Sequence, residues 1–136
     1  MPAEEHARDL AKTAARAAAS KFGQGIVALD VADRLALTDV FLIVTGETER
    51  QVDAIVDAID EAMREAGSKI IRREGTQELR WVLLDYGDII VHVQHAEDRD
   101  FYGLDRLWKD CEEIELPADL ADPTVTDSVS NGEGFA

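Results

Sequence analysis

Two stretches of the chain repeat apolar residues with the period of an α-helix. Residues 4–22 carry a stripe of mostly small residues and are followed by Gly23. Residues 48–66 begin with a capping box, in which Thr48 caps the helix and Gln51 reaches back. Behind this box runs a stripe of larger residues: Val52, Ile55, Val56, Ile59 and Met63. Both stretches are predicted to be helices that bury one face.

Shorter apolar runs predict strands. Residues 26–31 form the first, and residues 40–44 the second, which is apolar at every position and therefore typical of a strand covered on both faces. Residues 69–73 predict a short edge strand. A last helix is expected to begin at Asp98 or a neighbour, with four residues on one face: Phe101, Leu104, Leu107 and Trp108.

Between these lies the most informative segment, in which residues 80–84 and 89–94 flank a glycine-containing break. This pattern predicts a β-hairpin. With Tyr86-Gly87 as the loop, Asp85 pairs with Asp88, Leu83 with Ile90 and Trp81 with His92. Side chains alternate across strands, so one face is aliphatic: Val82, Leu84, Ile89, Val91 and Val93. The other face is mixed: Trp81, Leu83, Ile90, His92 and Gln94.

The two faces predict two roles. The aliphatic face belongs against a core. On the mixed face, Trp81 has two interpretations: a core tryptophan in a sheet covered on both sides, or the aromatic anchor of a protein–protein contact. The pattern alone leaves both open.

The order of elements predicts one α/β domain over residues 1–116, with a mixed sheet covered by helices. Residues 117–136 are acidic, carry no apolar periodicity and are expected to form a disordered tail.

Charge narrows the choice of partners. The chain holds 14 basic and 29 acidic residues, for a net charge of −15. All 14 basic and 22 of the acidic residues lie in 1–111, so residues 1–111 alone carry a net charge of −8. This charge disfavours direct nucleic-acid binding and favours a basic protein partner. The single Cys111, an acidic N-terminus and the absence of an apolar run long enough to span a bilayer indicate a cytoplasmic protein.

Candidate chemistry is sparse. His92 and His95 are three residues apart on a strand and point to opposite faces, so they do not form a shared metal site. Asp98 and Asp100 could bind magnesium, but carboxylates at a helix start are explained by capping and the helix dipole. Acidic neighbours argue against Cys111 as a nucleophile. No catalytic, cofactor-binding or metal-binding residue is predicted, and the protein is expected not to be an enzyme.

The chain resembles the ribosomal silencing factor family, also called Iojap-like proteins. The matching blocks, in order, span residues 28–31, 38–46, 50–52, 74–75 and 81–92, and then Arg99, Tyr102, Leu104 and 106–108. The family often has cysteine where this chain has Val40, a buried strand position that needs only a small apolar group.

The resemblance implies a fold similar to nucleotidyltransferases but without their catalytic residues. It implies binding to the fourteenth protein of the large ribosomal subunit, which blocks subunit association and represses translation when nutrients are limiting, and a weak homodimer in the free protein. We expect the partner contact to use six residues: Trp81, Leu83, Asp85, His92, Arg99 and Tyr102. The alternative is a metal-dependent nucleotidyltransferase or a degenerate nucleotide-binding protein, whose Gly-Ser loop and paired carboxylates are not evident here.

Overall fold

The computed structural model describes residues 3–117 and 120, without the side chains of Phe101 and Asp105. Within these residues the elements are α1 (Glu5–Ser20), β1 (Gln24–Asp30), β2 (Val40–Gly46), α2 (Glu49–Glu65), β3 (Arg72–Glu74), β4 (Trp81–Asp85), β5 (Ile89–His95), α3 (Ala96–Tyr102), α4 (Leu104–Leu107) and β6 (Glu113–Ile114). The strands form one sheet in the order β3-β4-β5-β2-β1-β6. Because β2 and β5 run parallel while the other neighbours run antiparallel, the predicted α/β domain with a mixed sheet is confirmed.

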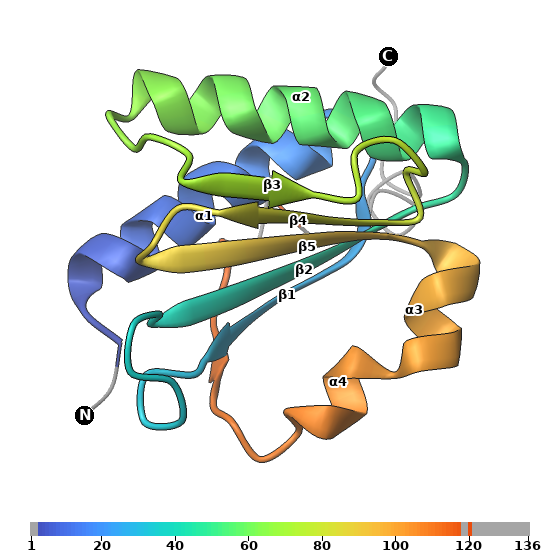
Figure 1. Cartoon of the computed structure of the whole chain (residues 1–136). Coiled ribbons are helices and arrows are strands. Elements are labelled where there is room, and N and C mark those ends of the chain that lie inside the picture. Colours follow the sequence, from blue (N-terminus) through green and yellow to red (C-terminus); the bar gives the residue numbers. More distant parts are fainter. Residues whose placement is uncertain (1–2, 118–119, 121–136) are drawn as a thin grey trace, which may run out of the picture.

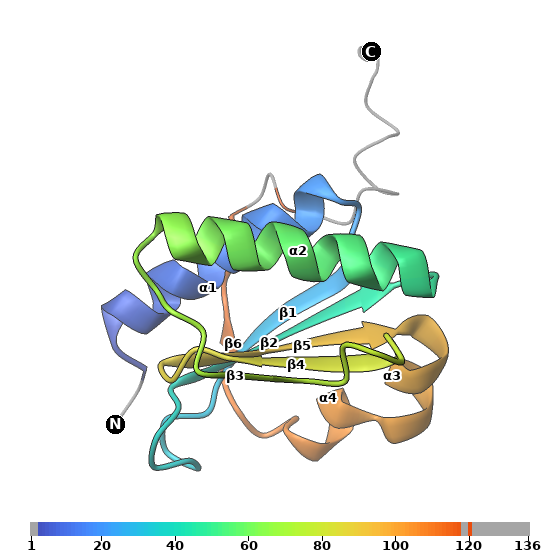
Figure 2. The same ribbon diagram turned by 45° about the horizontal axis from the view of Figure 1, so that its top comes forward.

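Helices α1 and α2 lie side by side on one face of the sheet, whereas α3 and α4 lie on the opposite side (Figures 1 and 2). The main core fills the space beneath α1 and α2. It includes the predicted aliphatic face of the hairpin and the predicted stripe of α2. Strand β2 is buried along its whole length, as predicted for a strand covered on both faces.

The start of α2 also fixes the end of α1. Thr48 caps α2 by accepting a hydrogen bond at Oγ1 from the Gln51 backbone N–H over 3.1 Å. Gln51 reaches back one residue further than a capping box requires, because its Oε1 accepts from the backbone N–H of Glu47. Its Nε2 donates to the carbonyls of Lys21 and Phe22, which joins the two helices.

The predicted hairpin is present, but its predicted register is wrong by two residues. Asp85 pairs with Ile90, Leu83 with His92 and Trp81 with Gln94. The loop is therefore Gly87-Asp88, and Gly87 has φ +85, the left-handed conformation that a tight two-residue hairpin loop needs at its first position.

The single helix predicted from Asp98 is instead two short ones. His95 caps α3, because its Nδ1 accepts the Glu97 backbone N–H. Gly103 then adopts φ +61 and ends α3 before α4 begins. This break rotates the predicted apolar face. Leu104 stays buried while Leu107 is 71% exposed, and the Phe101 side chain lies outside the described residues.

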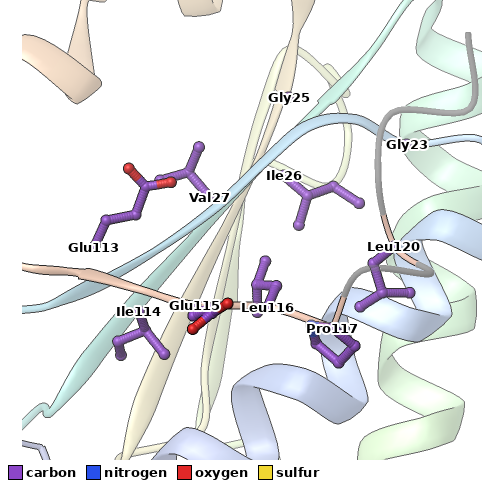
Figure 3. A pocket seen from close by; sticks show the side chains of 10 residues that line it. All are labelled: Gly23, Gly25, Ile26, Val27, Glu113, Ile114, Glu115, Leu116, Pro117 and Leu120. Carbon is purple, nitrogen blue, oxygen red and sulfur yellow. The ribbon is translucent and has the colours of Figure 1, made fainter. Parts of the chain in front are cut away.

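Most of the predicted tail 117–136 lies outside the described residues, so its disorder stays a prediction. Leu120 is described, however, and packs into the main core with 9% exposure. It borders a hollow of about 560 Å³ along β1, around which Ile26, Leu116 and Leu120 gather (Figure 3). Among the described residues no helix is long and apolar enough to cross a membrane.

Candidate protein-binding surface

The side of the sheet away from α1 and α2 is only partly covered. Along β4, Val82 and Leu84 are buried in the main core, whereas Trp81, Leu83 and Asp85 are half-buried on the other side. Ile90 of β5 is likewise half-buried. We call this half-buried set, Trp81, Leu83, Asp85 and Ile90, the open face. Its alternation with the buried residues confirms the two faces predicted for the hairpin.

A row of aromatic rings runs from the open face toward β2. Tyr102 of α3, which is 50% exposed, stacks at a tilt on Trp81 with ring centroids 5.0 Å apart. The indole Nε1 of Trp81 donates a hydrogen bond to His92 Nδ1 over 3.1 Å. Phe41 then meets His92 edge-on at 4.8 Å and Trp108 at 5.0 Å. Such contacts fix ring orientations more firmly than aliphatic packing does. Trp81 is thus an ordered aromatic with part of its surface in solvent.

The polar atoms beneath this row are unusually isolated. His92 is only 5% exposed, and burial lowers the pKa of its imidazole to about 4. It is therefore neutral at pH 7 and available to accept the indole N–H. Among the described residues, no hydrogen-bond partner reaches its Nε2 or either amide atom of the fully buried Gln94. Buried polar groups are normally paired, so each of these unpaired atoms lowers the free energy of unfolding.

The structure brings together four of the six residues predicted for the contact. Trp81, His92 and Tyr102 touch in the aromatic row, and Leu83 pairs with His92 across the hairpin. Asp85 shares the face of Trp81 but lies at the far end of β4. Its carboxylate accepts the Gly87 backbone N–H at 2.8 Å and lies 3.7 Å from Arg72.

Arg99 forms hydrogen bonds away from the hairpin. Its Nη1 donates to the carbonyl of Gly25 at 2.6 Å and to the hydroxyl of Thr45 at 2.7 Å, at the ends of β1 and β2. A Cβ at Gly25 would come within 2.9 Å of this nitrogen, so glycine leaves room for the bond. Arg99 therefore anchors α3 to β1 and β2, and its contact with a partner stays a prediction.

Sequence reasoning missed Arg80, the residue before Trp81. Its guanidinium donates to Asp98 through both Nε and Nη2, to Glu97 and to Glu49. The sequence does place an arginine next to Trp81 and acidic residues at the starts of two predicted helices. This pattern could have indicated an ion pair at Arg80. Phe41 lies in the second predicted strand and Trp108 on the apolar face predicted for the last helix, and both complete the aromatic row.

Nothing in the described part of the chain groups three or more His, Cys, Asp or Glu side chains closely enough to hold a metal ion. Asp98 and Asp100 both lie within α3, Asp98 in its first turn, and the Asp98 carboxylate pairs with Arg80 at 2.7 Å. This arrangement is a structural ion pair, which gives the carboxylate a role without a metal.

Comparison with known proteins places this surface in context. The family model described as ribosomal silencing factor during starvation matches residues 4–133. A ribosomal silencing factor of Bacillus subtilis is 40% identical over 103 residues, which are 76% of this chain and 87% of the relative. One from Halalkalibacterium halodurans is 38% identical over 109 residues, or 80% and 93% of the two chains.

The fold agrees with these matches. A crystal structure of a protein from Chromobacterium violaceum superposes with a TM-score of 0.73 at 31% identity, covering 86% of this chain and 97% of that one. The match to the family model extends over α1 to α4, including the strands that form the open face. The chain therefore belongs to the ribosomal silencing factor family.

Proposed function

We propose that this protein binds the large ribosomal subunit through its fourteenth protein, with the open face and Tyr102 as the contact surface. Bound there, it blocks association with the small subunit and represses translation when nutrients are limiting. The family is a non-enzymatic regulator of the ribosome, so binding is the activity to be explained.

One observation carries the choice of surface. Trp81 is held in orientation by His92 and Tyr102 and packs against a second, smaller core cluster, yet the residue is only half-buried. Binding energy in protein interfaces is concentrated in such aromatic anchors, since an ordered ring loses little entropy when it is covered. Half-buried Leu83 lies next to Trp81 on the same face, and Ile90, which pairs with Asp85, would extend the apolar surface toward the other end of β4.

Charge supports a basic protein as the partner. The net charge of −15 repels the phosphates of ribosomal RNA. Exposed acids Glu49 and Glu97 lie at the helix starts that flank Arg80, next to Trp81 in sequence. A rim of this kind speeds encounter with a basic surface and orients it. Direct sequence-specific nucleic-acid binding is no part of the proposal.

The remaining features follow from the same proposal. In the free protein a second copy covers the open face, giving a weak two-fold homodimer that a ribosome displaces. The protein acts in the cytoplasm, where it meets free large subunits. We also propose, from the family resemblance, that its topology is similar to that of nucleotidyltransferases but without their catalytic residues. Sedimentation tests the homodimer: a stable dimer on each large subunit would contradict the shared surface.

The central test compares binding and folding in Trp81→Ala. Pelleting with purified large subunits should show a loss of ~2–4 kcal/mol, typical of a central aromatic anchor. This corresponds to roughly a 30- to 1,000-fold weaker affinity. The melting temperature reports folding, because a core tryptophan would instead cost about 3–5 kcal/mol of stability.

Leu37→Ala is the matched control. Leu37 is 89% exposed and lies before β2, at the opposite end of the strands from Trp81. Truncating it removes exposed apolar surface without touching the open face, so binding should stay at the wild-type level. Equal losses in both variants, or full binding by Trp81→Ala, would rule out the open face. A melting temperature lowered by about 15 °C in Trp81→Ala would assign Trp81 to the core.

A further inference from the structure

Three elements begin around Arg80. The first turn of α2 contributes Glu49, the first turn of α3 contributes Glu97 and Asp98, and Arg80 itself directly precedes β4. The guanidinium reaches Asp98 at 2.7 Å, Glu97 at 2.9 Å and Glu49 at 3.4 Å. The Arg80 carbonyl also accepts the backbone N–H of His95, the cap of α3.

The ion pair and the aromatic contact link the same two elements. Arg80 and Trp81 are consecutive, while Asp98 and Tyr102 are four residues apart and therefore lie on one side of α3. Arg80 binds Asp98, and Trp81 packs on Tyr102. Both contacts join the start of β4 to α3. A displacement of α3 at the Arg80–Asp98 pair would therefore also displace Tyr102 from Trp81.

This pair differs from ordinary surface ion pairs, which contribute little because both side chains are mobile. Asp98 is largely buried, and it accepts two hydrogen bonds from one arginine, a geometry that fixes direction as well as distance. The hydrogen bond that Arg80 donates to Glu97 also lowers the pKa of the Glu97 carboxyl and raises the pKa of the Arg80 guanidinium. Arg80 and Glu97 are therefore both charged at neutral pH.

We propose that Arg80 is a positioning residue, which holds α3 so that Tyr102 stacks on Trp81 and the contact surface is formed before the partner arrives. This inference rests on the proposed function for its binding consequence, but the positioning itself is a property of the free protein. α3 has only seven residues and needs anchors from outside the helix. Arg99 supplies one at β1 and β2, and Arg80 supplies the other at β4.

The test uses the full chain labelled with 5-fluorotryptophan. The chain has two tryptophans, so fluorine NMR gives one resonance for Trp81 and one for Trp108, assigned with Trp81→Phe. Arg80→Gln should shift or broaden the Trp81 resonance, leave the Trp108 resonance in place, and weaken large-subunit binding about tenfold, or ~1.4 kcal/mol. Arg80→Lys keeps the positive charge but lacks the planar guanidinium. Its Trp81 resonance should therefore lie between the wild-type position and that of Arg80→Gln.

The matched control is Arg73→Gln, which removes another 2.9 Å arginine–carboxylate pair, with Asp60 of α2, away from α3. It should leave both resonances and binding unchanged. Asp98→Asn should shift the Trp81 resonance and weaken binding as Arg80→Gln does. The double variant should bind no more weakly than either single variant, because both substitutions remove the same ion pair.

An unmoved Trp81 resonance in Arg80→Gln would overturn the positioning role, and so would an equal shift in Arg73→Gln. Melting temperatures identify any variant that has lost its fold, and Arg80→Lys then carries the comparison. If the resonance moves as expected while Trp81→Ala binds subunits normally, the positioning role stands and the proposed contact surface fails.

Discussion

The indole N–H of Trp81 donates to Nδ1 of His92 across 3.1 Å, and this bond sets the protonation state of the histidine. Nδ1 must be unprotonated to accept, so the neutral imidazole carries its proton on Nε2. Burial acts in the same direction by lowering the pKa of His92 to about 4. The orientation of the candidate anchor thus depends on a neutral histidine.

We predict that His92 stays neutral down to about pH 4. Nitrogen-15 NMR of the imidazole should show the Nε2-protonated tautomer from pH 7.5 to 5, with a midpoint near the value of about 4. The exposed imidazole of His6 provides a comparison within the same sample. A His92 midpoint near 6.5 would show that the ring is hydrated and the bond to Trp81 absent.

Stability should consequently fall as the pH drops. The pKa of His92 is lower in the folded protein than in the unfolded chain, so the unfolded chain takes up the proton first. The stabilisation is complete above pH 6.5 and decreases toward pH 4, by about 2 kcal/mol between pH 6.5 and 5. Urea unfolding at these pH values measures it. His92→Leu, although less stable at pH 7, should lose less over the same interval; an identical loss would assign the effect to other groups.

Gln94 is a position where a substitution is expected to stabilise the protein. Its side chain is fully buried, and neither Nε2 nor Oε1 has a hydrogen-bond partner among the described residues. Such a group costs about 1–3 kcal/mol, whereas methionine has a similar shape and no amide to desolvate. Gln94→Met should therefore raise the free energy of unfolding by roughly 1 kcal/mol. Destabilisation instead would show that the amide is satisfied, for example by an ordered water.

The hairpin illustrates what the sequence determines. Its two faces were predicted correctly although the register was wrong, because a shift of two residues leaves the alternation of side chains unchanged. The loop position depended on which residue adopts a left-handed conformation, and both Tyr86-Gly87 and Gly87-Asp88 contain a glycine that can do so. The pairing of Asp85 with Ile90 is therefore fixed by the packed sheet, beyond the local pattern.

The arrangement of the candidate contact surface was harder to predict, because the direction of a side chain depends on tertiary packing. Arg99 and Tyr102 are three residues apart on α3, yet the arginine extends to β1 and β2 while the tyrosine covers Trp81. The role of Arg80 was hidden for the same reason. Its partners Glu49 and Glu97 lie 31 and 17 residues away, and no periodicity connects them.

The C-terminal boundary gives the last prediction. Composition alone predicts that a chain ending after Leu116 folds as well as the full protein, since 117–136 has too few apolar residues to offset the entropy of ordering. Leu120 alters that expectation, because its side chain is buried in the main core and its backbone N–H donates to Pro117 over 3.0 Å.

A chain ending after Leu120 should melt like the full protein, whereas one ending after Leu116 should lose about 1–3 kcal/mol, the value of burying one leucine. Leu120→Ala in the full chain should account for most of that loss. Both truncated chains and the Leu120→Ala variant keep Leu116. Their comparison therefore measures the contribution of the Leu120 side chain, which borders the hollow beside β1. Equal melting of the two truncated chains would place the end of the folded domain at residue 116, where composition puts it.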